Sequence, residues 1–168
     1  TLTSLGVDPC GELERRFPDI RFVRYDGRTF PFSDQSFDLC WSNAVLEHVG
    51  DRQAQVHFVR EVRRVARSAW LTTPNLHFPV EPHTRTPLLH LLGKRVFDAW
   101  LRFRGQGWAT GAYMNLLSRR ALLSILEEAQ AGPWRLMPRR KAGFVMEWIV
   151  ILEPREETDG PNRPGSHA

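Results

Sequence analysis

The sequence has few cysteines and no long apolar segment. Its two cysteines, Cys10 and Cys40, have neither the close spacing of a zinc site nor the density of a disulfide-stabilised fold. No apolar run approaches the roughly 20 residues that a membrane-spanning helix needs, and the amino terminus lacks the pattern of a signal peptide. We therefore expect reduced, structural cysteines, no metal site and a cytoplasmic protein.

Several catalytic signatures are also missing. The sequence has no His-Glu-x-x-His helix, no Gly-x-Ser-x-Gly elbow and no phosphate-binding loop with a lysine, which excludes the common zinc hydrolases, serine hydrolases and kinases. Lysine occurs only at Lys94 and Lys141, so the net charge of +4 comes from arginine. Because these charges scatter through the expected helices, we interpret them as solvated faces and expect no nucleic-acid partner.

The remaining composition is that of one globular domain. Hydrophobic residues make up 42% of the 168 residues, which is enough to bury a substantial core. Runs of apolar residues bounded by Pro, Gly and Asp alternate with amphipathic segments. This alternation predicts an α/β fold with an open, mostly parallel sheet. The expected strands are 2–7, 20–25, 37–42 and 69–73, and the expected helices are 12–17 and 51–67, the second capped by Asp51.

The second half of the chain is less regular. Residues 76–115 contain several prolines and predict a lid-like insertion with a helix over 88–103 that begins at Thr86-Pro87. That helix mixes apolar and basic residues. It would pack on its own domain, cover an apolar substrate, or make peripheral membrane contact through 86–104. Ser118 predicts the start of a further helix with a stop near Gly132. Two strands over 134–138 and 144–152 are expected to close a domain of residues 1–152. Residues 153–168 are expected to be a disordered tail.

Polar residues follow three of the expected strands. In an open α/β sheet, ligands bind beyond the carboxyl ends of the strands, so Asp8, Asp26, Gly27 and Asn43 are candidate binding residues. A carboxylate at Asp8 can accept hydrogen bonds from both ribose hydroxyls of a nucleoside cofactor. The carboxylate of Asp26 can accept the exocyclic amine of adenine, and Gly27 lets the ring approach the backbone.

A combination of motifs points to one family. Val7-Asp8-Pro9, Asp26-Gly27, Ser36-Phe37-Asp38 and Leu46-Glu47-His48-Val49 together resemble the class I S-adenosylmethionine (SAM)-dependent methyltransferases that act on small molecules. The motifs cover roughly residues 5–75. The resemblance implies a Rossmann-like sheet with an antiparallel last strand, SAM as the cofactor, Asp8 at its ribose, Asp26 at its adenine, and Asn43 near its methionine part.

The glycine-rich loop of that family has no counterpart in this sequence. The string Gly105 to Gly111 follows a helix and has a different spacing. The resemblance therefore implies that the family's first strand, which lies between its second and fourth strands, is missing too. We expect that the native polypeptide is longer. The alternatives are that the two orphan strand edges pair directly, or that the chain is poorly stable by itself.

The resemblance also suggests a mechanism. Methyl transfer from a sulfonium is an in-line displacement, so the protein positions the reactants and supplies a base for the acceptor's proton. His48 and His83 are the candidate catalytic residues, with Glu81 and Tyr113 as further base candidates. The acceptor would be a small molecule or lipid-like. The alternatives are a non-catalytic remnant or partner-binding subunit with the same fold, and a nicotinamide dehydrogenase, which does not account for the motifs around Phe37 and Leu46.

Overall fold

The computed structural model describes residues 1–154 and has the α/β architecture that the sequence predicts. The predicted tail over 153–168 falls mostly outside the described residues. The elements that build the main layers are β1 (Leu2–Gly6), α1 (Gly11–Arg16), β2 (Ile20–Arg24), β3 (Phe37–Asn43), η1 (Leu46–His48), α2 (Arg52–Val65), β4 (Ala66–Pro74), α4 (Arg119–Glu128), β7 (Trp134–Lys141) and β8 (Phe144–Leu152).

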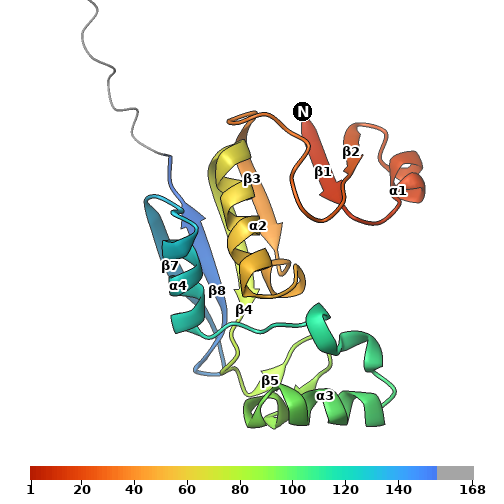
Figure 1. Ribbon diagram of the computed structural model, residues 1–168, viewed down its shortest axis with the longest axis vertical. Helices are drawn as coiled ribbons and strands as arrows, with labels where there is room; N and C mark the ends of the chain where they lie inside the picture. The colour runs from red at the N-terminus through yellow and green to blue at the C-terminus, as the bar shows by residue number, and fades with distance from the viewer. Residues whose placement is uncertain (155–168) are drawn as a thin grey trace, which may run out of the picture.

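The six strands of the main layers form two separately hydrogen-bonded units. One is a four-stranded sheet in the order β3-β4-β8-β7, and the other is the parallel pair β1-β2. In the larger sheet β3 and β4 are parallel, while β8 is antiparallel to both of its neighbours. Among the described residues β1 and β3 make no ladder with each other, so their edges do not pair directly. Figure 1 shows β1 and β3 as neighbouring ribbons that run toward the same end of the molecule.

One hydrophobic core lies between the larger sheet and two helices. Val59 and Val62 of α2, Leu122 of α4 and Val150 of β8 are all buried in a single cluster. The cluster forms because the apolar residues of α2 recur every three or four positions and so share one face of the helix. Burying each such side chain contributes about 1.5 to 3 kcal/mol, which fixes α2 and α4 on the sheet.

The segment 76–115 lies beyond the carboxyl ends of β1 and β3 (Figure 1). It contains β5 (Val80–Glu81), β6 (Thr86–Pro87), η2 (Leu89–Leu92), α3 (Lys94–Phe103), η3 (Gly107–Ala109) and η4 (Gly111–Tyr113). The predicted single helix over 88–103 is wrong. Pro87 belongs to a short strand, and Leu88 at φ 56° and Gly93 at φ 99° leave the helical region, so the regular helix begins only at Lys94.

The last two strands form a hairpin that is longer than predicted. β7 continues from Trp134 to Lys141, three residues past the expected end, because Ala142 and Gly143 both adopt positive φ in a tight turn that suits the twist of paired strands. The helix α4 begins after Ser118 as predicted but ends at Glu128. Gln130, at φ 52°, turns the chain before Gly132 is reached. Among the described residues, no helix has the length and apolar character to cross a membrane.

Candidate functional site

Asp8 and Asp26 lie at the same edge of the molecule. Asp8 follows β1 and Asp26 follows β2, and these strands are parallel and in register, with Gly6 opposite Arg24. The carboxyl ends of adjacent parallel strands meet at one edge of a sheet, so Asp8 and Asp26 both lie at that edge. Both side chains are exposed, which leaves them available to a ligand.

Gly27 sits where the two strand ends approach each other. Its φ of +80° suits glycine, and a Cβ atom added there would lie 3.5 Å from Cγ1 of Val7. The preceding Asp26 accepts a hydrogen bond at Oδ1 from the backbone N–H of Arg28 at 2.9 Å. This turn holds the Asp26 side chain at the end of β2 and leaves its second oxygen, Oδ2, available.

Asn43 ends β3 at the corresponding edge of the larger sheet. Its Oδ1 accepts a hydrogen bond of 2.8 Å from the hydroxyl of Thr72, which lies opposite it on β4. The backbone then turns sharply at Ala44, at φ 52°. This turn leads into η1, which carries Glu47 and His48.

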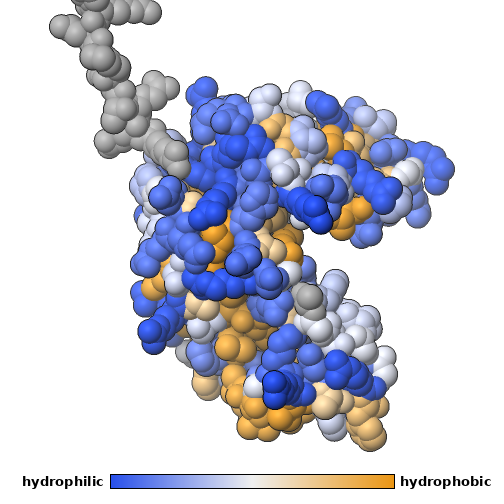
Figure 2. All heavy atoms as spheres, in the orientation of Figure 1, coloured by the Kyte–Doolittle hydropathy of each residue, from blue (hydrophilic) through white to orange (hydrophobic). Residues whose placement is uncertain are grey.

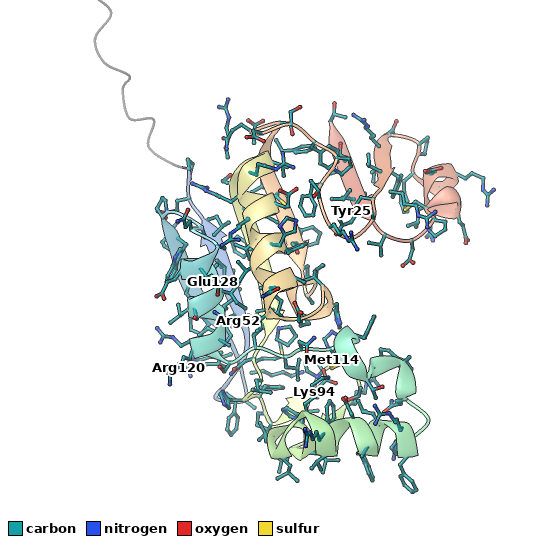
Figure 3. The ribbon with its side chains drawn as sticks, viewed as in Figure 1. Tyr25, Arg52, Lys94, Met114, Arg120 and Glu128 are labelled. Carbon is teal, nitrogen blue, oxygen red and sulfur yellow. The ribbon has the colours of Figure 1, made fainter. Side chains whose placement is uncertain are left out.

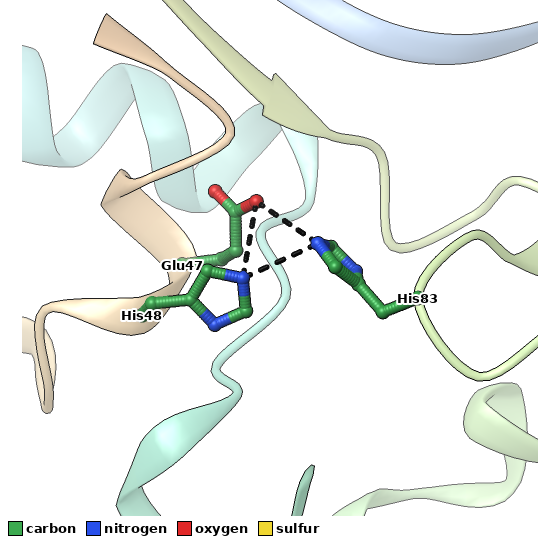
Figure 4. A group of neighbouring side chains, drawn as sticks. All are labelled: Glu47, His48 and His83. Carbon is green, nitrogen blue, oxygen red and sulfur yellow. Dashed lines mark hydrogen bonds and ion pairs between the residues drawn. The ribbon is translucent and has the colours of Figure 1, made fainter. Parts of the chain in front are cut away.

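Glu47 is a buried carboxylate with only one of its oxygens satisfied. The side chain is 0% exposed, and its Oε2 accepts a 2.9 Å hydrogen bond from the hydroxyl of Thr73 on β4. Within the described residues Oε1 has no hydrogen-bond partner. It lies 3.8 Å from Nε2 of His48 and 3.8 Å from Nε2 of His83 (Figure 4).

His83 is held by a second buried carboxylate. The turn between β5 and β6 presents His83, and its Nδ1 lies 2.7 Å from Oε1 of Glu81. Glu81 also accepts hydrogen bonds from the backbone N–H groups of His83 and Thr84 and from the Thr84 hydroxyl. Glu81 is therefore a fully bonded carboxylate that fixes the orientation of the His83 ring.

His48 is held by a backbone carbonyl. Its Nδ1 lies 2.8 Å from the carbonyl oxygen of Tyr113, and the two rings are tilted at 37° with centroids 4.8 Å apart. A carbonyl oxygen can only accept, so Nδ1 of His48 carries the hydrogen. The same segment contacts η1 a second time, because the N–H of Asn115 donates to the carbonyl of Glu47 at 2.8 Å. The 76–115 segment thus closes over the cluster on two sides.

The buried charges shift the ionisation of this cluster. Burial raises the pKa of Glu47. Burial alone would also raise the pKa of Glu81, but hydrogen bonds from His83 and Thr84 lower it to about 2. The hydrogen bond to Glu81 raises the pKa of His83. Glu81 is therefore ionised at neutral pH, and its carboxylate accepts a hydrogen bond from Nδ1–H of His83.

The surface around these residues is concave. Figure 2 shows the molecule hollowed between the β1-β2 unit and the 76–115 segment. A separate cavity of about 630 Å³ lies elsewhere, between the 76–115 segment and the helices α2 and α4. Figure 3 labels Arg52, Lys94 and Met114 around it. None of the candidate residues lines that cavity, so we place the candidate site at the carboxyl edge of the strands.

The structure brings together some of the predicted residues. His48 and His83, which are 35 positions apart, have their Nε2 atoms 3.2 Å apart, and Glu81 and Tyr113 contact them as described above. Asp8, Asp26 and Gly27 lie together on the β1-β2 unit. Glu47 is the residue that sequence reasoning missed as a functional candidate, although the motif around Leu46 contains it.

Comparisons with known proteins show a family match over part of the chain and a shared fold over most of it. The methyltransferase domain family matches residues 3–69. No curated protein shows a significant match. Among solved structures, a protein from Bordetella parapertussis has a TM-score of 0.62 at 14% identity, with 92% of this chain and 54% of that chain covered.

Two further structures show the same fold. A SAM-dependent methyltransferase from Methanosarcina mazei has a TM-score of 0.55 at 16% identity, covering 89% of this chain and 79% of that one. The N-terminal domain of EvdMO1 with SAH bound has a TM-score of 0.57 at 14% identity, covering 92% and 65%. The fold is thus the Rossmann-like α/β fold of these enzymes, and the chain spans about half the length of the first structure. The family match covers less than half of the chain, and the solved structures show the fold that it shares with methyltransferases.

Proposed function

We propose that the protein transfers a methyl group from SAM to a small-molecule or lipid-like acceptor. The observation that carries this proposal is that two exposed acidic residues, Asp8 and Asp26, follow the carboxyl ends of adjacent parallel strands in a methyltransferase fold. One adenosine would bridge them, with its ribose hydroxyls donating to Asp8 and its adenine amine donating to Asp26. The SAH-bound relative supports SAM as the cofactor.

The histidine pair supplies the acceptor side of the same edge. In-line transfer requires the acceptor oxygen or nitrogen to lie directly behind the methyl group, and a nearby base speeds the reaction by taking its proton. Nε2 of His83 or of His48 is the atom for that role, because both Nδ1 atoms are already engaged. Glu81 then acts as a positioning residue, since it fixes the ring of His83.

Cofactor binding tests this proposal directly. We expect S-adenosylhomocysteine to bind the full chain in titration calorimetry, and Asp8→Ala to weaken binding about 100-fold or more, because two hydrogen bonds to a charged acceptor are lost at about 1.5 kcal/mol or more each. Asp38→Ala is the matched control, since Asp38 is an exposed carboxylate near the amino end of β3. Equal affinities in all three proteins would refute the assignment of Asp8. Absence of binding by the folded wild-type chain would favour the non-catalytic alternative.

The acceptor side also includes an apolar surface. Leu88, Leu91, Leu92, Val96 and Phe103 are large exposed side chains on or beside η2 and α3. Figure 2 shows apolar residues gathered over this end of the molecule. Basic residues flank them, and this combination suits contact with an anionic lipid surface. We therefore retain peripheral membrane contact through 86–104 as part of the proposal.

A further inference from the structure

Three lone pairs converge between Glu47, His48 and His83. Nδ1 of His48 donates to a carbonyl, and Nδ1 of His83 donates to Oε1 of Glu81, which also accepts the backbone N–H of His83, so in the neutral rings both Nε2 atoms carry lone pairs. These two atoms nevertheless face each other at 3.2 Å. Oε1 of Glu47, buried and without a hydrogen-bond partner within the described residues, points at both of them. Such an arrangement is repulsive unless a proton or a metal cation lies between these atoms.

We propose that Glu47, His48 and His83 bind a divalent transition-metal ion of the zinc class. The geometry of the three donor atoms supports this directly. Their separations are 3.2, 3.8 and 3.8 Å. The point equidistant from the corners of such a triangle lies about 2.1 Å from each of them, which is the bond length of Zn²⁺ to imidazole nitrogen and carboxylate oxygen.

The surroundings of the three ligands are those of a metal site. Ligating histidines usually donate their second ring N–H to a carboxylate or a carbonyl, which fixes the tautomer that leaves the other nitrogen free. His83 does so to Glu81, and His48 does so to the carbonyl of Tyr113. Glu47 is oriented in the same way by the hydroxyl of Thr73. Every ligand therefore has an outer partner that holds it in place.

A shared proton explains the cluster less well. One proton between the two Nε2 atoms would relieve the repulsion between the histidines. It would leave Oε1 of Glu47 buried without a hydrogen bond, because 3.8 Å is too long for one to either ring. A proton on Oε1 would also form no hydrogen bond to either ring, because both Nε2 atoms lie 3.8 Å away. A divalent ion satisfies all three atoms at once and neutralises the charge of Glu47.

The donor set indicates the class of ion. Two imidazoles and one carboxylate suit zinc, iron, cobalt and nickel, whereas magnesium prefers oxygen ligands alone. Three protein ligands also leave a position open, as in catalytic metal sites. The side chains of His48 and His83 are 19% and 24% exposed, so solvent reaches two of the three ligands. An ion bound there would coordinate the acceptor and lower the pKa of its hydroxyl, in place of a histidine base.

Metal titration of the full chain tests the proposal. After dialysis against a chelator, we expect calorimetry to show one Zn²⁺ bound per chain in the presence of excess Mg²⁺, and Co²⁺ to give the visible absorption of a four-coordinate site. Glu47→Gln and His83→Ala should each weaken Zn²⁺ binding at least 100-fold. Glu81→Gln removes only an outer partner and should weaken it about 10- to 100-fold.

The matched control is His57→Ala, which removes an exposed histidine on α2 outside the cluster and should leave affinity unchanged. Circular dichroism of each variant identifies any that fails to fold, and Glu47→Gln is the isosteric variant that keeps the bond to Thr73. Absence of Zn²⁺ binding by the folded wild type, or binding that Glu47→Gln and His83→Ala do not alter, would overturn the proposal. Metal and S-adenosylhomocysteine are titrated in separate experiments. A chain that fails to bind S-adenosylhomocysteine can therefore still be tested for Zn²⁺ binding.

Discussion

Arg64 and Glu61 connect the helix α2 to the loop that leads from the β1-β2 unit to β3. The guanidinium of Arg64 donates to both oxygens of Glu61 and to the backbone carbonyls of Phe30 and Phe32. Glu61 is buried and also accepts the N–H of Phe30 at 2.7 Å. Two side chains one helical turn apart thus satisfy several backbone groups of a loop that has no ladder of its own.

Replacing Glu61 should lower stability more than replacing the other carboxylate partner of Arg64. We expect Glu61→Gln to cost about 2 kcal/mol in the free energy of unfolding, because a buried charge-assisted pair is broken. Asp34→Asn should cost about 0.5 kcal/mol or less, because the Asp34 side chain is 75% exposed. Urea unfolding at pH 7 measures both values. Equal effects of the two substitutions would contradict this account.

The same pair gives a pH dependence with a definite sign. Hydrogen bonds from Arg64 are the first cause that lowers the pKa of Glu61 below its ordinary 4.5. A carboxyl group with a lowered pKa in the folded state stabilises the protein fully above its unfolded pKa, and this contribution disappears as the pH falls through the folded value. The stability difference between wild type and Glu61→Gln should therefore be constant near neutrality and shrink below about pH 4.5. A difference that stays constant under acid would argue against the pairing.

Single residues of the candidate site were predictable to different degrees. Asp8, Asp26 and Asn43 follow apolar runs, so their positions at strand ends could be read from the sequence. Glu47 could not be recognised, because it lies directly before His48 on a short turn, and its partner His83 comes from a distant loop. Standard metal-ligand spacings describe helices and paired loops, and this cluster has neither.

At the scale of elements, the sequence predicted correctly those features that depend only on neighbouring residues, such as helix caps. Asp51 and Ser118 accept hydrogen bonds from the N–H groups three residues later, so both caps and the starts of the helices that follow them were predicted correctly, whereas α2 and α4 end earlier than predicted. The helix over 88–103 was predicted wrongly because periodicity did not reveal the turns at Leu88 and Gly93. Those turns let Leu88 donate its N–H to the carbonyl of Pro79, a contact that depends on the folded segment.

The segment formed by η2 and α3 carries the prediction for membrane contact. Leu92 and Phe103 are 67% and 81% exposed, so substituting both with serine removes apolar area that would enter a lipid surface. We expect Leu92→Ser with Phe103→Ser to weaken binding to vesicles containing phosphatidylglycerol at least 10-fold in a sedimentation assay, because each buried side chain is worth about 1.5 kcal/mol or more. Phe144→Ser, at an exposed position on the β7-β8 hairpin, is the control and should bind as the wild type does. If wild type and double variant sediment equally, 86–104 is not the contact surface.

At the scale of the whole molecule, the two strand units differ in how they are supported. The strands β4 and β8 have ladder partners on both sides, whereas β1 and β2 pair only with each other among the described residues. On β3 the side chain of Trp41 is 70% exposed, on the sheet face opposite to buried Ser42 and Leu71. A two-stranded unit is marginal by itself, so β1-β2 depends on packing of residues such as Leu5 and Tyr25 against the main core.

This difference predicts an uneven pattern of amide hydrogen exchange. Peptides from β1 and β2 should exchange faster than those from β4 and β8, because they open without unfolding the main core. If Asp8 and Asp26 hold the cofactor, S-adenosylhomocysteine at 100 times its dissociation constant should stabilise the closed state by about 2.7 kcal/mol and slow exchange in β1 and β2 about 100-fold. Asp8→Ala at the same ligand concentration should show much less slowing. Because the ligand contacts only the folded strand ends, protection limited to β4 and β8 would mean that it binds elsewhere, and the carboxylates would lose their assigned role.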